Sequence, residues 1–292
     1  MSSFKFNFSA GEDAANTEAT TSAEAVSENI KWLQSSEIIP SYQIKELDLI
    51  VKHAKMFISG DTEIGHVMIS ETSINIENDK LQNAVVLAEK EHSDLVVGKY
   101  EGGLKIWECT HDLVEYFEGH KDKINFDNKR VLDLGCGAGI LGIYAFLNKA
   151  NVTFQDYNKE VIEYATIPNV LLNIEEDLRE TKITKCKFYC GDWESFNNTC
   201  VCVFDIIITS ETIYNEHNYE KLLNIFLDKL DVNGSVYVAA KTYYFGVGGG
   251  TRKFEQILKN NGSLNIEVCW KSVCGGIQRE ILKITRKETF YK

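Results

Sequence analysis

Three glycines, Gly135, Gly137 and Gly139, form the part of this 292-residue sequence whose spacing most clearly predicts chemistry. They follow directly after a short apolar run at 130–134 and precede a run that is typical of a helix. Glycines in such a place let the backbone turn tightly, adopt positive φ and approach a ligand closely. Open α/β sheets bind ligands at loops of this kind, at the carboxyl ends of their strands. The sequence therefore predicts a nucleotide-type site here.

The glycine spacing alone leaves two ligands open. Residues 137–142 satisfy the dinucleotide pattern G-x-G-x-x-G. A dinucleotide, however, is anchored by its pyrophosphate at a helix N-terminus, and Asp133, inside the preceding strand, suits a cationic amino group better than a phosphate. Asp156, at the end of the next predicted strand, can accept both ribose hydroxyls of either ligand. The acid at 133 therefore favours a ligand without phosphate.

The segment Leu132-Asp-Leu-Gly-Cys-Gly-Ala-Gly139 resembles motif I of the class I S-adenosylmethionine methyltransferases. That class holds adenine after its third strand with a polar group and an aromatic or apolar side chain, and Gly191, Asp192 and Trp193 stand at that place. The antiparallel pair expected at the end of the chain is also similar to that class. The resemblance implies S-adenosylmethionine as cofactor.

Longer blocks resemble one family, the histidine protein methyltransferases, which methylate a histidine of a large-subunit ribosomal protein. They are Tyr100-Glu-Gly-Gly-Leu-Lys-Ile-Trp-Glu-Cys-Thr110, Phe154-Gln-Asp-Tyr-Asn158, Ile167-Pro-Asn-Val170, Thr209-Ser-Glu-Thr-Ile-Tyr-Asn215 and Tyr244-Phe-Gly-Val-Gly-Gly-Gly250. The opening Phe4-Lys-Phe-Asn-Phe8 is also similar. The likeness covers about 94–285 plus this start, whereas 9–91 matches little.

This resemblance implies which residues contact the cofactor. Together with Asp133 they are Lys105, Ile106, Trp107, Glu108, Cys109, Gly135, Gly137, Gln155, Asp156, Tyr157, Gly191, Asp192, Trp193 and Ser210. Trp107 follows a flexible Gly-Gly pair, so we expect it to close over the cofactor as a lid. By the same resemblance we expect methylation of the tele nitrogen and a monomeric enzyme.

A histidine acceptor sets its own requirements on the site. With an ordinary pKa of about 6.5, the imidazole is mostly neutral at pH 7, so it needs the correct tautomer more than it needs deprotonation. A carboxylate near the methyl site would fix that tautomer and take the proton that the ring later loses. Glu211, just past the fourth strand, is our candidate, with Tyr214 shaping the ring pocket and Asn169 as a further polar candidate.

These residues must be positioned by alternating strands and helices. Apolar runs predict strands at 130–134, 152–156, 186–190, 204–209 and 235–240, with helices at 140–147, 160–172, 217–230 and 251–260 between them. Runs at 266–270 and 278–285 predict a closing antiparallel hairpin. Alternation of this kind predicts an α/β fold, a Rossmann-like seven-strand methyltransferase sheet. Before it we expect a helix around 42–57, then through 95–110 a strand, a Gly-Gly turn and a second strand or extended segment, and a helix at 111–117.

We expect three parts in the chain: a disordered tail with a short aromatic anchor at 1–29, an extension at 30–93 and the methyltransferase domain at 94–292. The net charge of −12 disfavours direct nucleic-acid binding and suits a basic protein substrate. No apolar run is long enough to span a membrane, and no signal core opens the sequence. The eight cysteines lack zinc spacing, so we expect no metal site. We expect the protein in the cytoplasm, with the nucleus as a second location.

Three other functions compete with histidine methylation. A protein-lysine methyltransferase would share the fold and cofactor and differ only in its acceptor pocket. A dinucleotide oxidoreductase remains compatible with the glycines at 137, 139 and 142. A non-catalytic adaptor would bind the cofactor and transfer nothing. Identification of the methylated amino acid separates these alternatives.

Overall fold

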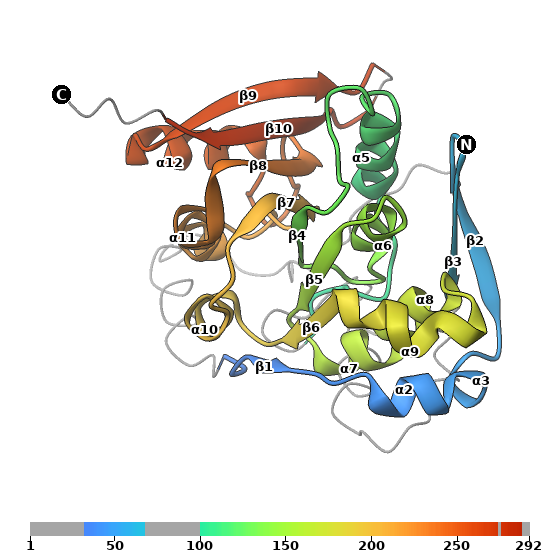
Figure 1. The fold of residues 1–292 in the computed structure, drawn as a ribbon. Helices are drawn as coiled ribbons and strands as arrows, with labels where there is room; N and C mark the ends of the chain where they lie inside the picture. The colour runs from blue at the N-terminus through green and yellow to red at the C-terminus, as the bar shows by residue number, and fades with distance from the viewer. Residues whose placement is uncertain (1–31, 68–99, 274–275, 288–292) are drawn as a thin grey trace, which may run out of the picture.

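A computed structural model describes residues 32–67, 100–273 and 276–287 of the chain (Figure 1). Its centre is an eight-stranded sheet in the order β1-β6-β5-β4-β7-β8-β10-β9. The strands are β1 Ser36–Glu37, β4 Arg130–Leu134, β5 Asn151–Asp156, β6 Cys186–Cys190, β7 Phe204–Ser210, β8 Leu230–Lys241, β9 Leu264–Lys271 and β10 Arg279–Arg286. The strands β6, β5, β4, β7 and β8 are parallel. The last strand, β10, lies antiparallel between β8 and β9.

Helices cover both faces of this sheet. They are α5 Glu108–Glu118, α6 Ile140–Leu147, α7 Lys159–Val161, α8 Ile167–Leu172, α9 Arg179–Lys182, α10 Trp193–Thr199, α11 Tyr219–Lys229 and α12 Thr251–Asn261. A π-helical segment, Ile162–Thr166, joins α7 to α8, and short 3-10 turns lie at 176–178, 183–185 and 216–218. The alternation of strand and helix and the antiparallel terminal pair confirm the predicted fold class.

The sheet separates two hydrophobic cores, because successive side chains of a strand point to opposite faces. Within β4, Val131 belongs to the core beneath α5, α6 and α8, and Leu132 belongs to the core beneath α10, α11 and α12. Phe117 and Phe226, both almost fully buried, are central side chains of the two cores. The carboxyl ends of β4, β5, β6 and β7 therefore meet at one edge of a rigid two-sided framework.

Residues 32–67 differ from the expectation. The predicted helix at 42–57 is wrong: α2 Ser41–Lys45 and α3 Leu47–Ile50 are short, and a hairpin of β2 Ala54–Ser59 and β3 Thr62–Val67 follows. The hairpin packs against α5 and α8 (Figure 1). Ahead of it, β1 adds antiparallel to the free edge of β6. This part of the chain thus builds on the main sheet.

Two further expectations meet the structure between 95 and 117. The predicted extended segment is wrong for its last residues, because the helix α5 already begins at Glu108 and includes the predicted helix at 111–117. Residues 95–99, the aromatic start at 4–8 and the tail at 9–29 lie outside the described residues. Among the helices that are described, none has the length and apolarity needed to cross a membrane.

Candidate cofactor and methyl-transfer site

A single cavity collects most of the residues singled out in the sequence. It lies over the carboxyl ends of β4, β5, β6 and β7. Its lining includes these residues from the sequence prediction: Lys105, Ile106, Trp107, Asp133, Gly135, Gly137, Asp156, Tyr157, Gly191, Asp192, Trp193, Ser210, Glu211 and Tyr214. The structure therefore brings together segments from across more than 100 positions of the chain in one place.

Two glycines of the loop after β4 are required by close packing. Gly135 has φ 66° and Gly137 has φ 52°, which side chains rarely adopt. A Cβ at 135 would lie 2.6 Å from Cγ2 of Thr212, and a Cβ at 137 would lie 2.7 Å from the carbonyl oxygen of Gly103. The loop is thus a cradle whose floor any side chain would fill.

Hydrogen bonds hold this cradle from beneath. The carboxylate of Asp156 accepts the N–H of Gly137 at 2.9 Å. On the other side of the loop, Thr166 Oγ1 donates to the Gly137 carbonyl at 2.6 Å and Asn169 Nδ2 donates to the Ala138 carbonyl at 2.8 Å. The π-helical segment ends at Thr166, so this helical irregularity delivers a hydroxyl to the loop.

Two buried acids lie under the loop. Burial raises the pKa of Asp133 to about 7, against the opposing hydrogen bond from the N–H of Gly142. Burial likewise raises the pKa of Asp156 to about 6, although the N–H groups of Asn158 and Gly137 stabilise its charged form. A nearby cation or a pair of donating hydroxyls would therefore stabilise the ionised form of each carboxylate.

The loop after β6 presents an aromatic ring to the same cavity. Trp193 Nε1 donates to Oε1 of Gln155 at 2.9 Å, and Nε2 of Gln155 donates to the Gly191 carbonyl at 2.8 Å. Gln155 is fully buried and does not line the cavity. Gln155 was predicted to contact the cofactor, but in the structure it holds the ring of Trp193 in place.

The segment before α5 covers the cavity from the opposite side. Trp107 Nε1 donates to the Gly102 carbonyl at 3.2 Å, and the Lys105 ammonium lies 4.5 Å from the centre of the Trp107 ring. The hydroxyl of Tyr214 donates to the carboxylate of Glu101. Burial raises the pKa of Tyr214 well above its usual range, so the phenol stays protonated and keeps this contact.

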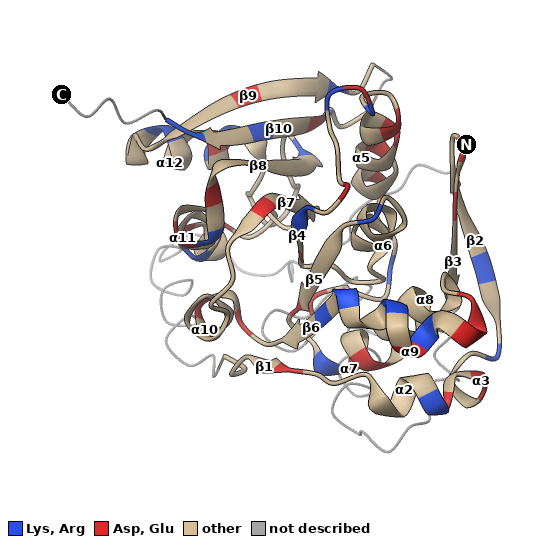
Figure 2. Cartoon of the chain, viewed as in Figure 1, with Lys and Arg blue, Asp and Glu red and all other residues tan. Residues whose placement is uncertain are grey.

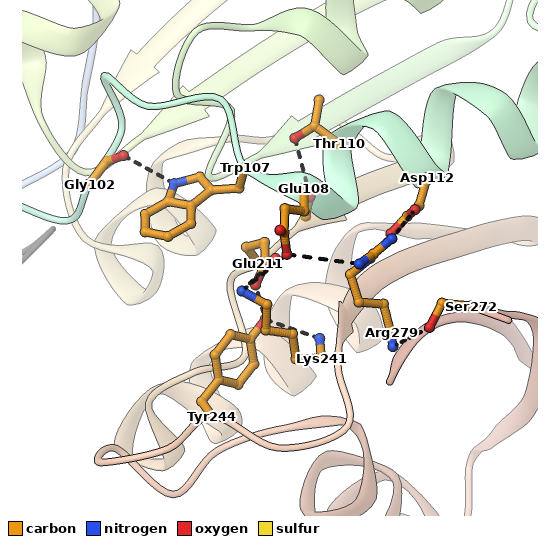
Figure 3. A network of polar contacts seen from close by, with 11 residues as sticks. Gly102, Trp107, Glu108, Thr110, Asp112, Glu211, Lys241, Tyr244, Ser272 and Arg279 are labelled. Carbon is orange, nitrogen blue, oxygen red and sulfur yellow. Dashed lines mark hydrogen bonds and ion pairs between the residues drawn. The ribbon is translucent and has the colours of Figure 1, made fainter. Parts of the chain in front are cut away.

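Glu211 lies at the centre of a network of charged groups (Figure 3). It follows β7 with φ 57°, a strained conformation for a residue with a side chain. The Tyr244 hydroxyl donates to Oε2, and the Lys241 ammonium lies 3.6 Å from Oε1. That oxygen is buried and has no hydrogen-bond partner among the described residues. A strained, buried carboxylate with one oxygen that lacks a hydrogen-bond donor is typical of a functional position.

The outer part of this network is ionic. Glu108 lies 3.7 Å from the Lys241 ammonium and 3.9 Å from the Arg279 guanidinium. Arg279, at the start of β10, also forms two hydrogen bonds with Asp112 of α5. Figure 2 shows several acidic positions along α5. The network joins α5, β8 and β10 around Glu211.

Three predicted site residues have other places in the structure. Glu108 points toward Lys241 and Arg279, and Cys109 is fully buried beside Glu211, so neither lines the cavity. Asn169 is also fully buried, and its amide is used at both ends, accepting the N–H of Val67 at 2.7 Å and donating to Ala138. In the structure Asn169 joins the hairpin to the glycine loop and does not line the cavity, so its catalytic role stays a prediction that the geometry does not favour.

Sequence reasoning missed several residues that line the cavity. Glu101 and Thr110 lie inside the block 100–110 that carries the family resemblance. Thr212 lies between the predicted site residues Glu211 and Tyr214. Trp32 comes from the N-terminal extension, more than 100 residues before Asp156. A tryptophan shortly after the polar segment 9–29 was the available signal for it.

The charges of the cavity test which cofactor it fits. Of the charged residues described as lining it, five are acidic and one is basic: Glu101, Asp133, Asp156, Asp192 and Glu211 against Lys105. Such a lining repels a pyrophosphate and attracts a sulfonium and an ammonium group. Asp156 is placed to accept ribose hydroxyls. The residues present therefore fit S-adenosylmethionine and disfavour a dinucleotide.

Four features together define the fold of a class I S-adenosylmethionine-dependent methyltransferase. They are the order of the sheet, the glycine cradle, the acid at the end of β5 and the antiparallel strand β10 inserted between β8 and β9. The model of a family described as lysine methyltransferase matches residues 90–246. The histidine protein methyltransferase 1 homolog of Rattus norvegicus is 33% identical over 305 aligned positions, which cover 94% of this chain and 83% of the relative. The chain belongs to this family and, by that relative, to the histidine protein methyltransferases.

Other relatives agree with this placement. The homolog of Dictyostelium discoideum is 45% identical over 198 residues, 67% of this chain and 61% of the relative. The match spans 65% of the Bos taurus homolog, so this chain covers less than two thirds of either. The EEF1A lysine methyltransferase 3 of Mus musculus is 24% identical over 139 residues, 47% of this chain and 55% of the relative. Identity is thus higher to relatives named for histidine.

Solved structures of low sequence identity match part of the chain. The ribosomal protein L11 methylase of Lactobacillus delbrueckii has a TM-score of 0.45 and 22% identity, covering 66% of this chain and 89% of that one. The fold assignment rests on the sheet order described above and not on this likeness. Within the described ranges, no group of three or more His, Cys, Asp or Glu side chains could hold a metal ion.

Proposed function

We propose that this chain is a protein-histidine N-methyltransferase that uses S-adenosylmethionine. The observation that carries the proposal is the buried carboxylate of Glu211 at the cavity wall, with Oε2 held by Tyr244 and Oε1 free of hydrogen bonds among the described residues. The names of the relatives with 33–45% identity support the same acceptor. We further propose the tele nitrogen as the methylated atom and a large-subunit ribosomal protein as the substrate.

The chain's own residues would orient the acceptor ring. When bound, S-adenosylmethionine supplies an electrophilic methyl group on a sulfonium. A neutral imidazole attacks with the lone pair of one ring nitrogen, while its other nitrogen carries a proton. Oε1 of Glu211 accepts a hydrogen bond from that second nitrogen and so selects the tautomer. After methylation the ring is cationic, and the same oxygen takes the proton that the ring must lose.

The neighbourhood of Glu211 favours a neutral acceptor over a lysine. The Lys241 ammonium lies 3.6 Å from Oε1 and is itself buried. A substrate lysine ammonium at the same carboxylate would be repelled by this fixed cation, and like charges at such distances interact strongly where water is excluded. An uncharged imidazole meets no such repulsion. Lys241 therefore supports histidine as the acceptor.

A lysine acceptor is the second candidate function, since the matching family model carries that description. Product analysis separates the two. The purified chain is incubated with methyl-labelled S-adenosylmethionine and an unmethylated large-subunit ribosomal protein fraction, the protein is hydrolysed, and the labelled amino acid is identified. Methylhistidine in the tele form supports the proposal, and methyllysine overturns the acceptor. Absence of label together with intact cofactor binding would favour a non-catalytic adaptor.

The role of Glu211 has its own test in the same assay. Glu211→Gln keeps the shape of the side chain but removes the charge that takes up the proton, so we expect kcat to fall by about 100-fold or more. The dissociation constant for S-adenosylhomocysteine should stay within about twofold. Wild-type turnover with unchanged cofactor affinity would show that this role is wrong.

A further inference from the structure

Trp32 reaches the cofactor cavity from a segment that the family model does not cover. The matched region begins at residue 90, whereas Trp32 lines the cavity together with Tyr157, Asp192 and Trp193. Its ring lies edge-on to Tyr157, with 6.1 Å between the ring centres. An aromatic side chain from the N-terminal extension is therefore part of the wall.

Residues 33–38, which we call the edge strap, hold Trp32 in place through the backbone. The Leu33 carbonyl accepts the N–H of Asp192 at 2.8 Å, and the N–H of Ile38 donates to the Phe188 carbonyl at 2.8 Å. Between these bonds, Ser36 and Glu37 pair with Cys190 and Tyr189 in β1 and β6. The strap is thus a short strand added to the edge of the sheet.

Gly191 shows how closely the strap approaches. It has φ 105°, and a Cβ there would lie 2.6 Å from Cα of Ser35 and 2.7 Å from the Gln34 carbonyl oxygen. Gly191 had been singled out for the cofactor, yet the nearest atoms to its missing side chain belong to the strap. The glycine therefore allows the strap to lie against the loop that follows β6.

A charge pair fixes the ring of Trp32 at this end of the cavity. The Lys221 ammonium lies 3.7 Å from the centre of the Trp32 ring and 2.5 Å from Oδ1 of Asp192. The second carboxylate oxygen of Asp192 accepts the N–H of Glu194. The lysine bridges the ring from the strap and the acid after β6, so the indole is held by a cation–π contact.

The position along the sheet indicates what the ring would contact. The glycine cradle follows β4, Asp156 follows β5, and Asp192 and Trp193 follow β6, so the three groups succeed one another toward the strap. With the ribose hydroxyls at Asp156, the next part of the cofactor in that direction is its purine. A flat, uncharged base packs well on aromatic rings.

We propose that Trp32 is a binding residue for the adenine of S-adenosylmethionine, and that the edge strap is an essential part of the cofactor site. This inference rests on the cofactor named in the proposed function and is independent of the methyl acceptor. The strap adds an aromatic surface that the segment matched by the family model does not contain.

Binding of S-adenosylhomocysteine and of adenosine to the full chain tests this assignment. Trp32→Ala should weaken both ligands by about tenfold, because the lost surface faces the part that they share. Trp32→Phe, which keeps an aromatic ring, should lie within about threefold of wild type. Leu33→Ala is the matched control, because it changes an exposed side chain of the strap and keeps its carbonyl. The dissociation constants are measured by calorimetry for the first ligand and by competition for the second.

Each other outcome overturns the assignment. Equal binding by Trp32→Ala and wild type would show that the ring makes no contact. Weaker S-adenosylhomocysteine with unchanged adenosine would place the contact elsewhere on the ligand. Equal losses for the alanine and phenylalanine variants would mean that the strap, and not the ring, had been disturbed. Failure of the wild-type chain to bind either ligand would instead contradict the cofactor assignment of the proposed function.

Discussion

The hydroxyl of Tyr244 donates a hydrogen bond to Oε2 of Glu211, and this contact leaves Oε1 of the same carboxylate buried beside the Lys241 ammonium. The tyrosine comes from the loop after β8 and the glutamate from the loop after β7. Burial raises the pKa of Tyr244 well above its usual range, so the phenol remains a donor at any physiological pH. The carboxylate is therefore held by a hydrogen bond at one oxygen, whereas the other oxygen has no hydrogen-bond donor among the described residues.

Removal of the Tyr244 hydroxyl should impair catalysis without loss of the cofactor. In Tyr244→Phe the carboxylate of Glu211 loses the hydrogen bond from the phenol and can rotate, so we expect kcat to fall about tenfold or more. The affinity for S-adenosylhomocysteine should stay within about twofold. Tyr243→Phe is the matched control, since Tyr243 is the exposed neighbour. Equal kcat in both variants would contradict the positioning role of Tyr244.

Cofactor affinity should depend on pH through Asp156. Its pKa in the ligand-free fold is about 6, and only the ionised carboxylate can accept two ribose hydroxyls without donating. Below pH 6 a proton must leave Asp156 before binding, so affinity should fall by up to about tenfold for each pH unit. Because the pKa of Asp133 in the same cavity is about 7, affinity should become constant only about one pH unit above that value. Calorimetry with S-adenosylhomocysteine from pH 5 to 8 measures this. In Asp156→Asn the dependence should flatten at a weaker affinity, and a preserved step near pH 6 would assign it to another group.

Asn169 should prove structural. Asn169→Leu leaves the N–H of Val67 and the carbonyl of Ala138 without their partners, so we expect about 3 kcal/mol less free energy of unfolding in urea. The matched variant Asn173→Leu loses the bonds to Gly65 on the same hairpin but does not touch the glycine loop. Both variants should keep kcat within about threefold at saturating cofactor. A selective collapse of kcat in Asn169→Leu would restore its catalytic candidacy.

The glycine cradle should tolerate no methyl group at its floor. In Gly137→Ala the new Cβ would lie 2.7 Å from the Gly103 carbonyl oxygen at φ 52°, so the turn at 102–103 must move. We expect the dissociation constant for S-adenosylhomocysteine to rise at least about tenfold. Gly119→Ala, at the end of α5 with φ −71°, is the control and should bind as wild type. Unchanged binding by Gly137→Ala would place the cofactor away from this loop.

The strands of the main sheet could be predicted because buried strands are rich in apolar residues. β4 and β6 have the predicted bounds, since central parallel strands are continuous apolar runs bounded by turn residues. The hairpin at 54–67 could not be recognised in the same way. Met56 and Ile58 are exposed although apolar, so the alternation that marks a two-faced strand is absent from β2.

In the site, too, some residues could be predicted from the local sequence and others could not. The cradle and the acid after β5 depend on local sequence, so the motif placed them in one cavity. Trp32 and Lys241 depend on partners far along the chain: Trp32 on Lys221, which Asp192 holds, and Lys241 on Glu108 and Glu211. A sequence pattern does not carry such pairings. Glu108 was predicted to contact the cofactor, but because α5 begins at this residue its side chain points toward the ion pairs and not into the cavity.

The edge strap also has a consequence for the order in which the protein can assemble during synthesis. Residues 33–38 are made early, but their pairing strand, β6, ends at residue 190, so the strap must wait for roughly 150 further residues before it finds an edge to join. Closing so long a loop is slow and unfavourable before the neighbouring strands are in place. The purine end of the cavity therefore cannot form before β6 has been made, and a nascent chain should acquire the residues of its glycine cradle before it can retain a nucleoside.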